Sequence, residues 1–500
     1  MQSFVCFFRW MFSARILWRL FIGILSVVTL ITIAWQFENW RGRTKWGKWK
    51  TEWENKGEKF DLASVLSPKV PHEKNLAKSV LFEPLFDRDT NGKPSNQVAF
   101  DVAQNRFSLR STPRNTFGWR YGQQTNLDNW EREFLQLPDP PVKGVMPADT
   151  VLAALESYAD DMVTLANEVR RPKSRFDIRY EDSFNEHLPH LQVLRQAAVL
   201  FSLRASASLV KGDVNGALAD TVTIIRLAES IAAEPSIIAQ LVRVSILEIG
   251  IQSFWEGSAD HKWLAAHMVE LRSELQPINL IQGMALSFRG ERNMFNHWLS
   301  RLTGGDTDAV RQLEMFTDLS NPISISLPAG WIYQNQFHIN RIITDTILPS
   351  IDLKKRRLAT TGFNSIDEEI RTLKEGFTPY CFLAGMVLGA YDRMAIKMSA
   401  GQAAIDQAII VTALENHFLV KASYPESLDA LTPEWLKNVP GDWFSNSGMV
   451  YRLNSEGTFT LYSIGYNETE DDGRYVFGSG KRKPIEWDEG DWPWPSVMVE

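Results

Sequence analysis

The chain has 500 residues, of which 44% are hydrophobic and 23% are charged, so it is globular material with room for about three domains. Its formal net charge of -7 gives no basis for a nucleic-acid partner, because phosphate binding needs clustered Lys and Arg. Cys6 and Cys381 are the two cysteines, which excludes both a disulfide framework and a thiolate metal site.

The first predicted element is an apolar helix near the N-terminus. Residues 20–35 carry no charge, and residues 16–18 extend the apolar stretch on the other side of Arg19. A membrane-spanning helix needs roughly 17–25 residues, and an Arg near its end can reach the lipid headgroups. We therefore predict that residues 1–37 form a cytoplasmic tip and a single transmembrane anchor, with the lipid bilayer as a partner.

Two other interpretations of this segment stay open. A cleaved signal peptide normally ends in small residues, whereas Trp35 and Phe37 stand near the end of this run. A buried core helix is rarely apolar on all sides at the extreme N-terminus. Of the three interpretations, the sequence favours the anchor.

Basic residues lie on both sides of the predicted span, and they do not fix its direction. Those before it are Arg9, Arg15 and Arg19, and those after it are Arg41, Arg43, Lys45, Lys48 and Lys50. Counted alone, they slightly favour a cytoplasmic C-terminal side. The short N-terminal flank before the span, with its α-amino group, is easily retained inside, which favours the opposite direction.

Residues 38–148 are predicted to be an irregular juxtamembrane segment that wraps the body. Prolines interrupt it repeatedly, so short elements are expected. Five tryptophans follow the apolar run at short intervals and are expected at an interface: Trp35, Trp40, Trp46, Trp49 and Trp53.

Residues 149–376 are predicted to form a helical scaffold domain, since apolar residues recur there every three or four positions. The clearest helices cover 194–210 and 217–231, joined by a turn in which Gly212 ends the first and Asp213 or Asn215 caps the second. This hairpin resembles a tetratricopeptide repeat, but no second copy follows at a period of about 34 residues. Further helices are expected at 263–275, 280–299, 308–316 and 331–348.

The helix predicted at 236–255 is apolar on nearly every face, which places it at the centre of a bundle. It contains Arg243 and Glu248, and buried charges must be paired because an unpaired one costs several kcal/mol. Two interpretations follow: a polar functional site in the bundle, or structural ion pairs. The second is favoured.

No metalloprotease, serine hydrolase, nucleotide-binding or paired-cysteine motif occurs in the chain. His187 and His190 lie three residues apart, but Pro189 between them disfavours a shared helical face for a metal. Arg289, Glu291, Arg292 and His297 form a charged stretch for which an ion-paired surface is the favoured interpretation. An enzyme or receptor site around Arg243, Glu248, Glu291 and Arg292 is the alternative function.

Residues 377–500 are predicted to be a long helix at 383–421 followed by a small α+β domain. Strands are expected at 449–454 and 458–464, joined by a turn that contains Gly457. Three motifs occur in order: Tyr424-Pro-Glu-Ser-Leu-Asp-Ala-Leu431, Val439-Pro440-Gly441-Asp442-Trp443-Phe444, and Tyr462-Ser-Ile-Gly465 with Asn467 and Asp471-Asp472-Gly473.

In these motifs the region resembles the globular domain of type II secretion pseudopilins of the general secretion pathway protein G kind. The resemblance covers about 100 residues and implies a bacterial envelope protein with secretion-like protein partners. It also implies that the bulk of the chain is periplasmic or otherwise extracytoplasmic, and this is the orientation we predict. Trp443 stands where the family has proline, and the family's N-terminal processing signal with its adjoining helix is absent. The chain is therefore not expected to be a processed fibre subunit.

The resemblance also implies that the loop after the last predicted strand binds calcium, a hard cation that takes oxygen ligands. The oxygen-bearing residues there are Asn467, Glu468, Glu470, Asp471 and Asp472. A solvated acidic turn is the alternative. The sequence as a whole predicts a mainly α, membrane-anchored envelope protein with a structural, binding or scaffolding role.

Overall fold

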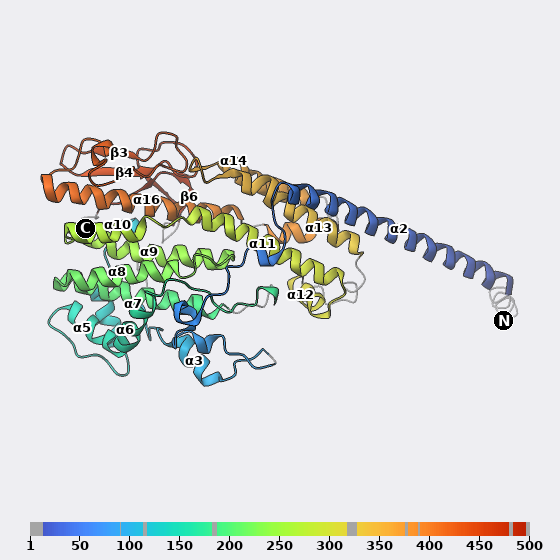
Figure 1. The fold of residues 1–500 in the computed structure, drawn as a ribbon, viewed down its shortest axis with the longest axis horizontal. Coiled ribbons are helices and arrows are strands. Elements are labelled where there is room, and N and C mark those ends of the chain that lie inside the picture. The colour runs from blue at the N-terminus through green and yellow to red at the C-terminus, as the bar shows by residue number, and fades with distance from the viewer. Residues whose placement is uncertain are drawn as a thin grey trace. The chain divides into compact units, whose positions relative to one another are not determined.

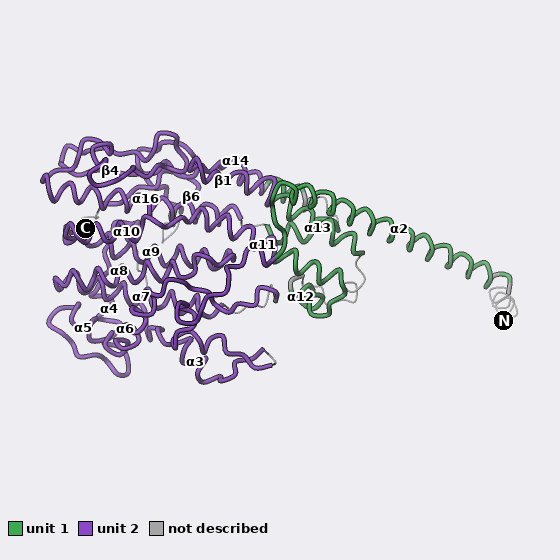
Figure 2. The backbone as a smooth tube through the Cα atoms, viewed as in Figure 1, with its two compact units in different colours: residues 1–61, 294–342, 368–389 green, residues 62–293, 343–367, 390–500 purple. Residues whose placement is uncertain are grey.

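The structure is a computed structural model that describes residues 14–90, 92–113, 118–182, 188–317, 328–375, 379–388, 391–479 and 484–496. The protein is mainly helical and begins with an apolar helix, as predicted (Figure 1). Contacts divide the chain into two compact units (Figure 2). Unit 1 contains residues 1–61, 294–342 and 368–389, and unit 2 contains residues 62–293, 343–367 and 390–500.

Unit 1 is built around the long helix α2. Its helices are α2 (Ala14–Asn55), α12 (Thr307–Thr317), α13 (Ala329–Arg341), α15 (Phe382–Val387) and the later part of α11 (Leu280–Thr303). The C-terminal half of α2 packs along α13, which also contacts α15. A 3-10 turn and a π-helical turn follow α13, so the helix predicted to reach residue 348 ends at Arg341.

Two glycines let the backbones of α2 and α13 meet. A Cβ added at Gly42 would collide with the carbonyl oxygen of Gly330, and one added at Gly330 would collide with the carbonyl oxygen of Glu38. The Gly330 amide donates a hydrogen bond of 2.8 Å to Asn39 Oδ1. A residue with any side chain at either glycine would therefore push the two helices apart.

Aromatic residues continue this contact toward the end of α2. The Trp46 and Trp49 rings pack against each other and against Phe60, and Trp49 also meets Phe337 of α13. The ammonium group of Lys45 lies 4.1 Å from the centre of the Phe337 ring. The tryptophans predicted at an interface thus include two that join α2 to the rest of unit 1.

Unit 2 is a helical bundle with small sheets on it. Its helices are α3 (Gln97–Asn105), α4 (Leu127–Leu135), α5 (Pro147–Leu155), α6 (Ala159–Glu168), α7 (Pro189–Lys211), α8 (Val214–Glu229), α9 (Ile237–Ala259), α10 (Ala265–Leu275), α16 (Tyr391–Lys421), the first part of α11 and the first part of α14 (Thr360–Glu375). Helices α7, α8 and α9 pack on one another, and α16 packs on α9 and α10 (Figure 1).

The hairpin of α7 and α8 forms as the turn residues predict. Gly212 adopts a left-handed φ of 81° just after α7, a conformation that L side chains rarely adopt. Asp213 caps α8 by accepting a 2.9 Å hydrogen bond from the Gly216 amide. Helix α9 lies between its neighbours, in keeping with its apolar sequence.

The strands are short and antiparallel. They form three sheets: β1 (Ile351–Asp352) with β2 (Arg357–Leu358); β3 (Val450–Leu453), β4 (Phe459–Ser463) and β7 (Trp492–Pro493) in the order β3-β4-β7; and β5 (Tyr475–Phe477) with β6 (Ile485–Gly490). The predicted hairpin is present as β3 and β4, with Gly457 at a φ of 78° in its turn. Helix α16 packs against β4, so a helix-then-sheet order is present in the C-terminal region.

Candidate functional sites

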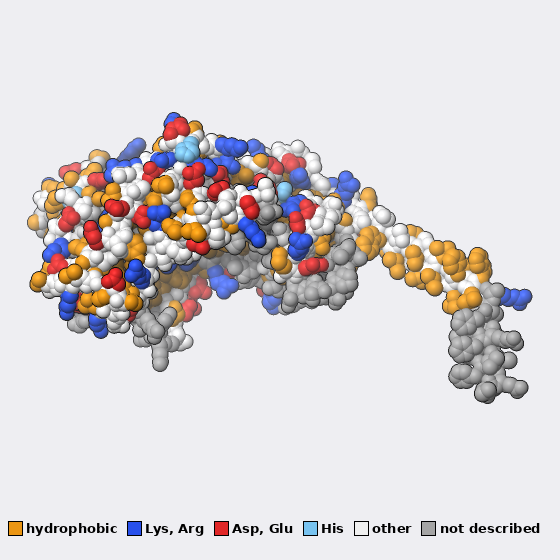
Figure 3. Space-filling model, turned by 90° about the horizontal axis from the view of Figure 1, so that it is seen from below, with side chains coloured by type: hydrophobic (Ala, Val, Ile, Leu, Met, Phe, Trp, Pro, Cys, Tyr) orange, Lys and Arg blue, Asp and Glu red, His pale blue; other side chains and the backbone are white. Residues whose placement is uncertain are grey.

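Helix α2 has the properties of a membrane anchor. It is 42 residues long, so at about 1.5 Å per residue it spans about 63 Å, roughly twice the thickness of a hydrocarbon core. None of its most apolar window is buried by the rest of the protein. Hydrophobic side chains line the part of α2 that extends away from the other helices of unit 1 (Figure 3). The first half of the helix therefore suits lipid.

Exposed tryptophans flank the uncharged residues 20–35, with Glu38 and Asn39 also standing before the second of them. Trp18 is 63% exposed and Trp40 is 64% exposed, whereas Gly42 and Trp46 further on are buried. The two tryptophans lie about 33 Å apart along the helix axis, close to the roughly 30 Å thickness of a hydrocarbon core. Tryptophan is enriched at membrane–water interfaces, so these positions fit the two edges of a bilayer.

Four described helical stretches are long and apolar enough to cross a membrane. Besides the stretch from Leu17 to Asn55, they are Pro189–Lys211, Ile237–Ala259 and Phe382–Lys421. In these three, between 56% and 78% of the most apolar window is buried inside the protein. Length and composition do not separate the four, which differ in how much of the apolar window the protein buries.

The charges predicted inside the bundle have separate partners. Arg243 donates hydrogen bonds of 3.0 and 2.7 Å to Glu229 Oε1 on α8. Glu248 accepts hydrogen bonds of 3.0 and 2.5 Å from the guanidinium of Arg120. Both arrangements are ion pairs, which is the structural interpretation that the sequence favoured.

Glu291 and Arg292 are also held by different groups. Glu291 Oε1 accepts a 3.0 Å hydrogen bond from the Ile237 amide at the start of α9, and burial raises the pKa of this carboxyl to about 7. Arg292 is fully buried and donates a 2.8 Å hydrogen bond to Thr344 Oγ1. The four residues of the alternative site thus bind four different partners.

The histidine pair is only partly described. Residues 183–187, which include His187, lie outside the described part of the chain. His190 is buried at the start of α7, where its Nε2 lies 2.9 Å from Glu234 Oε1 and its ring stacks on Phe176 at a centroid distance of 4.1 Å. This imidazole is a packed and hydrogen-bonded part of unit 2.

Arg120 was not identified from the sequence, although it joins three parts of unit 2. Besides the Glu248 pair on α9, it donates to the Tyr475 hydroxyl at 3.0 Å and to the Ala400 carbonyl at 3.2 Å. Its guanidinium also lies over the rings of Trp119 and Trp487. No motif surrounds Arg120, and no pattern in the sequence marks it.

Two motif residues of the C-terminal region connect turns to neighbouring elements, Asp442 to the end of strand β4 and Tyr424 to helix α16. Asp442 accepts hydrogen bonds from the Phe444 amide, the Ser463 hydroxyl and the Ile464 amide, at 3.1, 2.9 and 3.0 Å. Tyr424 donates a 2.6 Å hydrogen bond to Glu415 of α16. The motifs therefore have defined structural roles in this chain.

The acidic loop brings some of the predicted calcium ligands together and holds others apart. Asn467 donates a 2.8 Å hydrogen bond to Asp471, whereas Glu468 binds Arg357 and Thr360, and Glu470 binds Arg452 and Tyr462. Asp472 is exposed, with Arg452 at 3.9 Å. Among the described residues, no three His, Cys, Asp or Glu side chains are grouped to hold a metal ion.

Asp491 is a member of this loop region that the sequence did not indicate. Its side chain is fully buried, and Oδ2 accepts hydrogen bonds from the Asp471 and Gly473 amides at 2.8 and 2.6 Å. Oδ1 has no hydrogen-bond partner within the described ranges. Burial raises the pKa of this carboxyl, and the nearby Asp471 and Glu470 carboxylates raise it further. Calcium binding by this loop stays a prediction.

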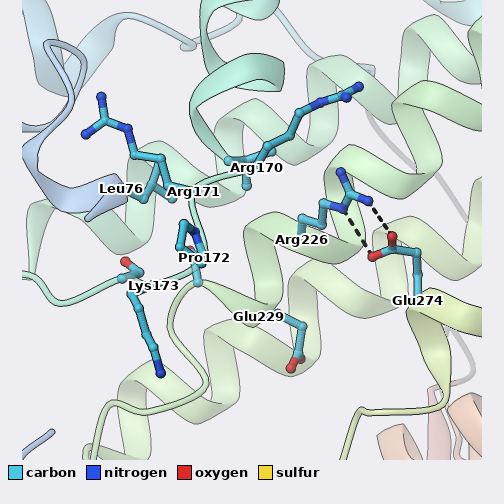
Figure 4. A pocket seen from close by; sticks show the side chains of 11 residues that line it. Leu76, Arg170, Arg171, Pro172, Lys173, Arg226, Glu229 and Glu274 are labelled. Carbon is cyan, nitrogen blue, oxygen red and sulfur yellow. Dashed lines mark hydrogen bonds and ion pairs between the residues drawn. The ribbon is translucent and has the colours of Figure 1, made fainter. Parts of the chain in front are cut away.

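A cavity of about 560 Å³ lies in unit 2 between the segment after α6 and the ends of α8 and α10 (Figure 4). Arg170, Arg171 and Lys173 come from the first wall, and Arg226, Glu229 and Glu274 come from the second. None of these residues was singled out from the sequence, because they are far apart in the chain and match no motif.

No family model, curated protein or solved structure matches this chain.

Proposed function

We propose that this protein is a single-pass, membrane-anchored scaffold or binding protein of the bacterial envelope, with the bulk of the chain outside the cytoplasm. The observation that carries the proposal is the continuity of α2. One uninterrupted helix provides both an exposed apolar stretch and a wall of the folded unit 1. Because cleavage after the apolar stretch would cut this continuous helix, we infer that the anchor is retained.

The burial of the other apolar helices supports a single span. Helices α7, α9 and α16 pack mainly against protein in unit 2, where they are apolar because they form its core. Helix α2 alone among the four presents an apolar window without protein cover in the described structure.

A role in a secretion- or pilus-like assembly is supported by the C-terminal motifs. Their residues make the contacts that fold the α16–β3–β4 region, and a helix precedes the small sheet there. The same motifs support an extracytoplasmic body. Other envelope proteins are the partners that this role requires.

Charged substitutions in the span test the anchor. Leu25→Arg with Val28→Arg places two cations near the bilayer centre, where each costs about 2.5–3.5 kcal/mol. We expect this variant to be released from membranes by alkaline washing, while the parent stays in the pellet. The matched control is Val142→Arg with Val145→Arg, two exposed valines outside the span. Release of the parent protein would refute the anchor.

Fusions to the C-terminus test the orientation. A phosphatase that is active only in the periplasm should be active, and a fluorescent protein that matures only in the cytoplasm should stay dark. Affinity purification from crosslinked membranes then tests the assembly, with recovery of the same envelope proteins expected in replicate preparations. A fluorescent fusion would reverse the orientation, and recovery of the chain alone would remove the assembly role.

A further inference from the structure

The cavity in unit 2 has one rigid wall that carries basic side chains. Asn75 holds this wall, because its side chain accepts a 2.8 Å hydrogen bond from the Arg175 amide and donates one of 3.0 Å to the Arg175 carbonyl. The Lys173 amide donates to the Lys74 carbonyl, and the Leu76 amide donates to the Lys173 carbonyl. The backbone of residues 173–175 is thus fixed along its inner edge.

Arg171 strengthens the same wall and is fully engaged in doing so. It forms a 2.6 Å ion pair with Glu168 and donates hydrogen bonds of 3.1 Å to the carbonyls of His72 and Asn75. In Figure 4 its guanidinium points away from the Arg226 side of the cavity. Arg171 therefore stabilises this wall, and its guanidinium is engaged within the protein and is not available to bind a ligand.

The charged side chains on the opposite wall, which come from α8 and α10, all form ion pairs. Arg226 binds Glu274 with hydrogen bonds of 3.1 and 2.5 Å, a two-point contact that Figure 4 shows. The Glu229 carboxylate is paired with Arg243. Each charge that these helices bring to the cavity already has an opposite partner.

Two of the positive charges at the cavity are not neutralised in this way by the described residues. Arg170 and Lys173 are exposed, and neither forms an ion pair or side-chain hydrogen bond within the part of the chain that the structure describes. They extend from the wall in different directions (Figure 4). A cavity bounded by protein concentrates the field of such charges, which raises the local concentration of anions.

We propose that this cavity binds a small anion that carries at least two negative charges. Its volume lies within the roughly 300–1,000 Å³ of typical ligand pockets. Arg170 offers a planar fork for a carboxylate or phosphate, and Lys173 offers a mobile ammonium for a second anionic group. The separation of the two cations favours a ligand whose charges stand at different ends. The site is independent of the membrane anchor.

Titration calorimetry on the full-length protein in detergent tests the site, with pyrophosphate and citrate as probes at ionic strength held constant with sodium chloride. We expect one-to-one binding of at least one probe. Arg170→Gln and Lys173→Gln should each weaken it by about tenfold, since a hydrogen bond to a charged group contributes about 1.5–3 kcal/mol. The double variant should bind no measurable probe.

The matched control is Arg179→Gln, an exposed arginine in the same connecting segment that does not line the cavity. It should bind as the parent does. All variants should keep the parent's melting temperature without probe, because the substituted side chains are exposed. Binding of neither probe, or equal binding by the double variant and the parent, would overturn the proposal.

Discussion

Glu291 is a half-buried residue whose carboxyl group has a single described hydrogen bond, from the Ile237 amide. Burial raises its pKa from 4.5 to about 7, so between these values the folded state keeps a proton that the unfolded state has released. Stability is therefore lost as pH rises through this window. The residue is a stability determinant with a defined pH dependence.

Glu291→Gln should remove this dependence while its amide oxygen still accepts the Ile237 hydrogen bond. At pH 4, below the unfolded pKa of 4.5, the variant and parent should be about equally stable, and at pH 8 the variant should be more stable by about 1–3 kcal/mol. Urea unfolding at a series of pH values measures the difference. Glu368→Gln, which alters an exposed ion pair, is the control and should not change the slope. Parallel profiles for Glu291→Gln and parent would contradict this assignment.

Arg120 should be the ion-pair residue to which unit 2 is most sensitive. Arg120→Met removes the cationic partner of Glu248, which keeps the 3.2 Å hydrogen bond from the Trp119 indole, and removes the donor to the Tyr475 hydroxyl, at a cost of about 3 kcal/mol. Adding Glu248→Gln should restore part of the loss, because no unpaired charge then remains. Thermal unfolding monitored by tryptophan fluorescence measures both. Arg371→Met, at an exposed pair, should cost less than about 1 kcal/mol.

Asp491 gives the calcium hypothesis a specific test. A cation would neutralise a buried carboxylate that stands beside Asp471 and Glu470, so about millimolar Ca²⁺ should raise the melting temperature at pH 7 if the loop binds it. Asp491→Asn should abolish that increase, whereas Asp429→Asn, in another turn of the same region, should not. No increase in the parent would identify the loop as an arginine-paired acidic turn.

At the scale of single elements, the contact between α2 and α13 depends on two glycines. Gly330→Val would force the helices apart, because its side chain would overlap the carbonyl of Glu38. We expect a loss of about 3 kcal/mol or more and rapid proteolysis of unit 1. Gly47→Ala lies in the same helix α2 with open space around it, so it should be neutral or stabilising. Equal protease sensitivity of the two variants would argue against the backbone contact.

The elements with strong local patterns could be predicted from the sequence. The hairpin of α7 and α8 followed from Gly212 and Asp213, and β3 and β4 followed from alternating residues around Gly457. Helix α14 and the strands β5, β6 and β7 were not predicted. Strands β5 and β7 are three and two residues long, too short for periodicity to identify, and β7 contains a proline. Strand β6 has six residues, but three of them are acidic, a residue type that is depleted in strands.

The partners of the charged residues could not be predicted either. A sequence indicates that Arg243 and Glu248 need partners, but not that these are Glu229 and Arg120. The cavity could not be predicted for the same reason, since its walls come from four separate stretches of chain. Such groupings depend on packing between distant segments, which single-sequence patterns do not encode.

At the scale of the whole molecule, each compact unit is assembled from three stretches of the chain. Unit 1 needs residues 38–61 to cover α13, so deletion of residues 1–37 should give a protein with an intact unit 1 that no longer binds membranes. Deletion of residues 1–61 should also expose Phe337 and make residues 294–342 sensitive to protease. Limited proteolysis with mass spectrometry compares the two. Equal digestion of both would show that α2 does not stabilise unit 1.

Helix α2 passes from its exposed apolar half into unit 1 without a break, and the structure shows no proline or glycine-rich joint between Trp35 and Asn55 that would act as a hinge. The apolar half of α2 is consequently joined to the packed part of unit 1 by a continuous helix and not by a flexible linker. Any tilt of the apolar half in the bilayer would therefore also tilt the helices of unit 1 that pack on the other half. The thickness of the surrounding bilayer would then help to set the angle at which this unit meets a neighbour.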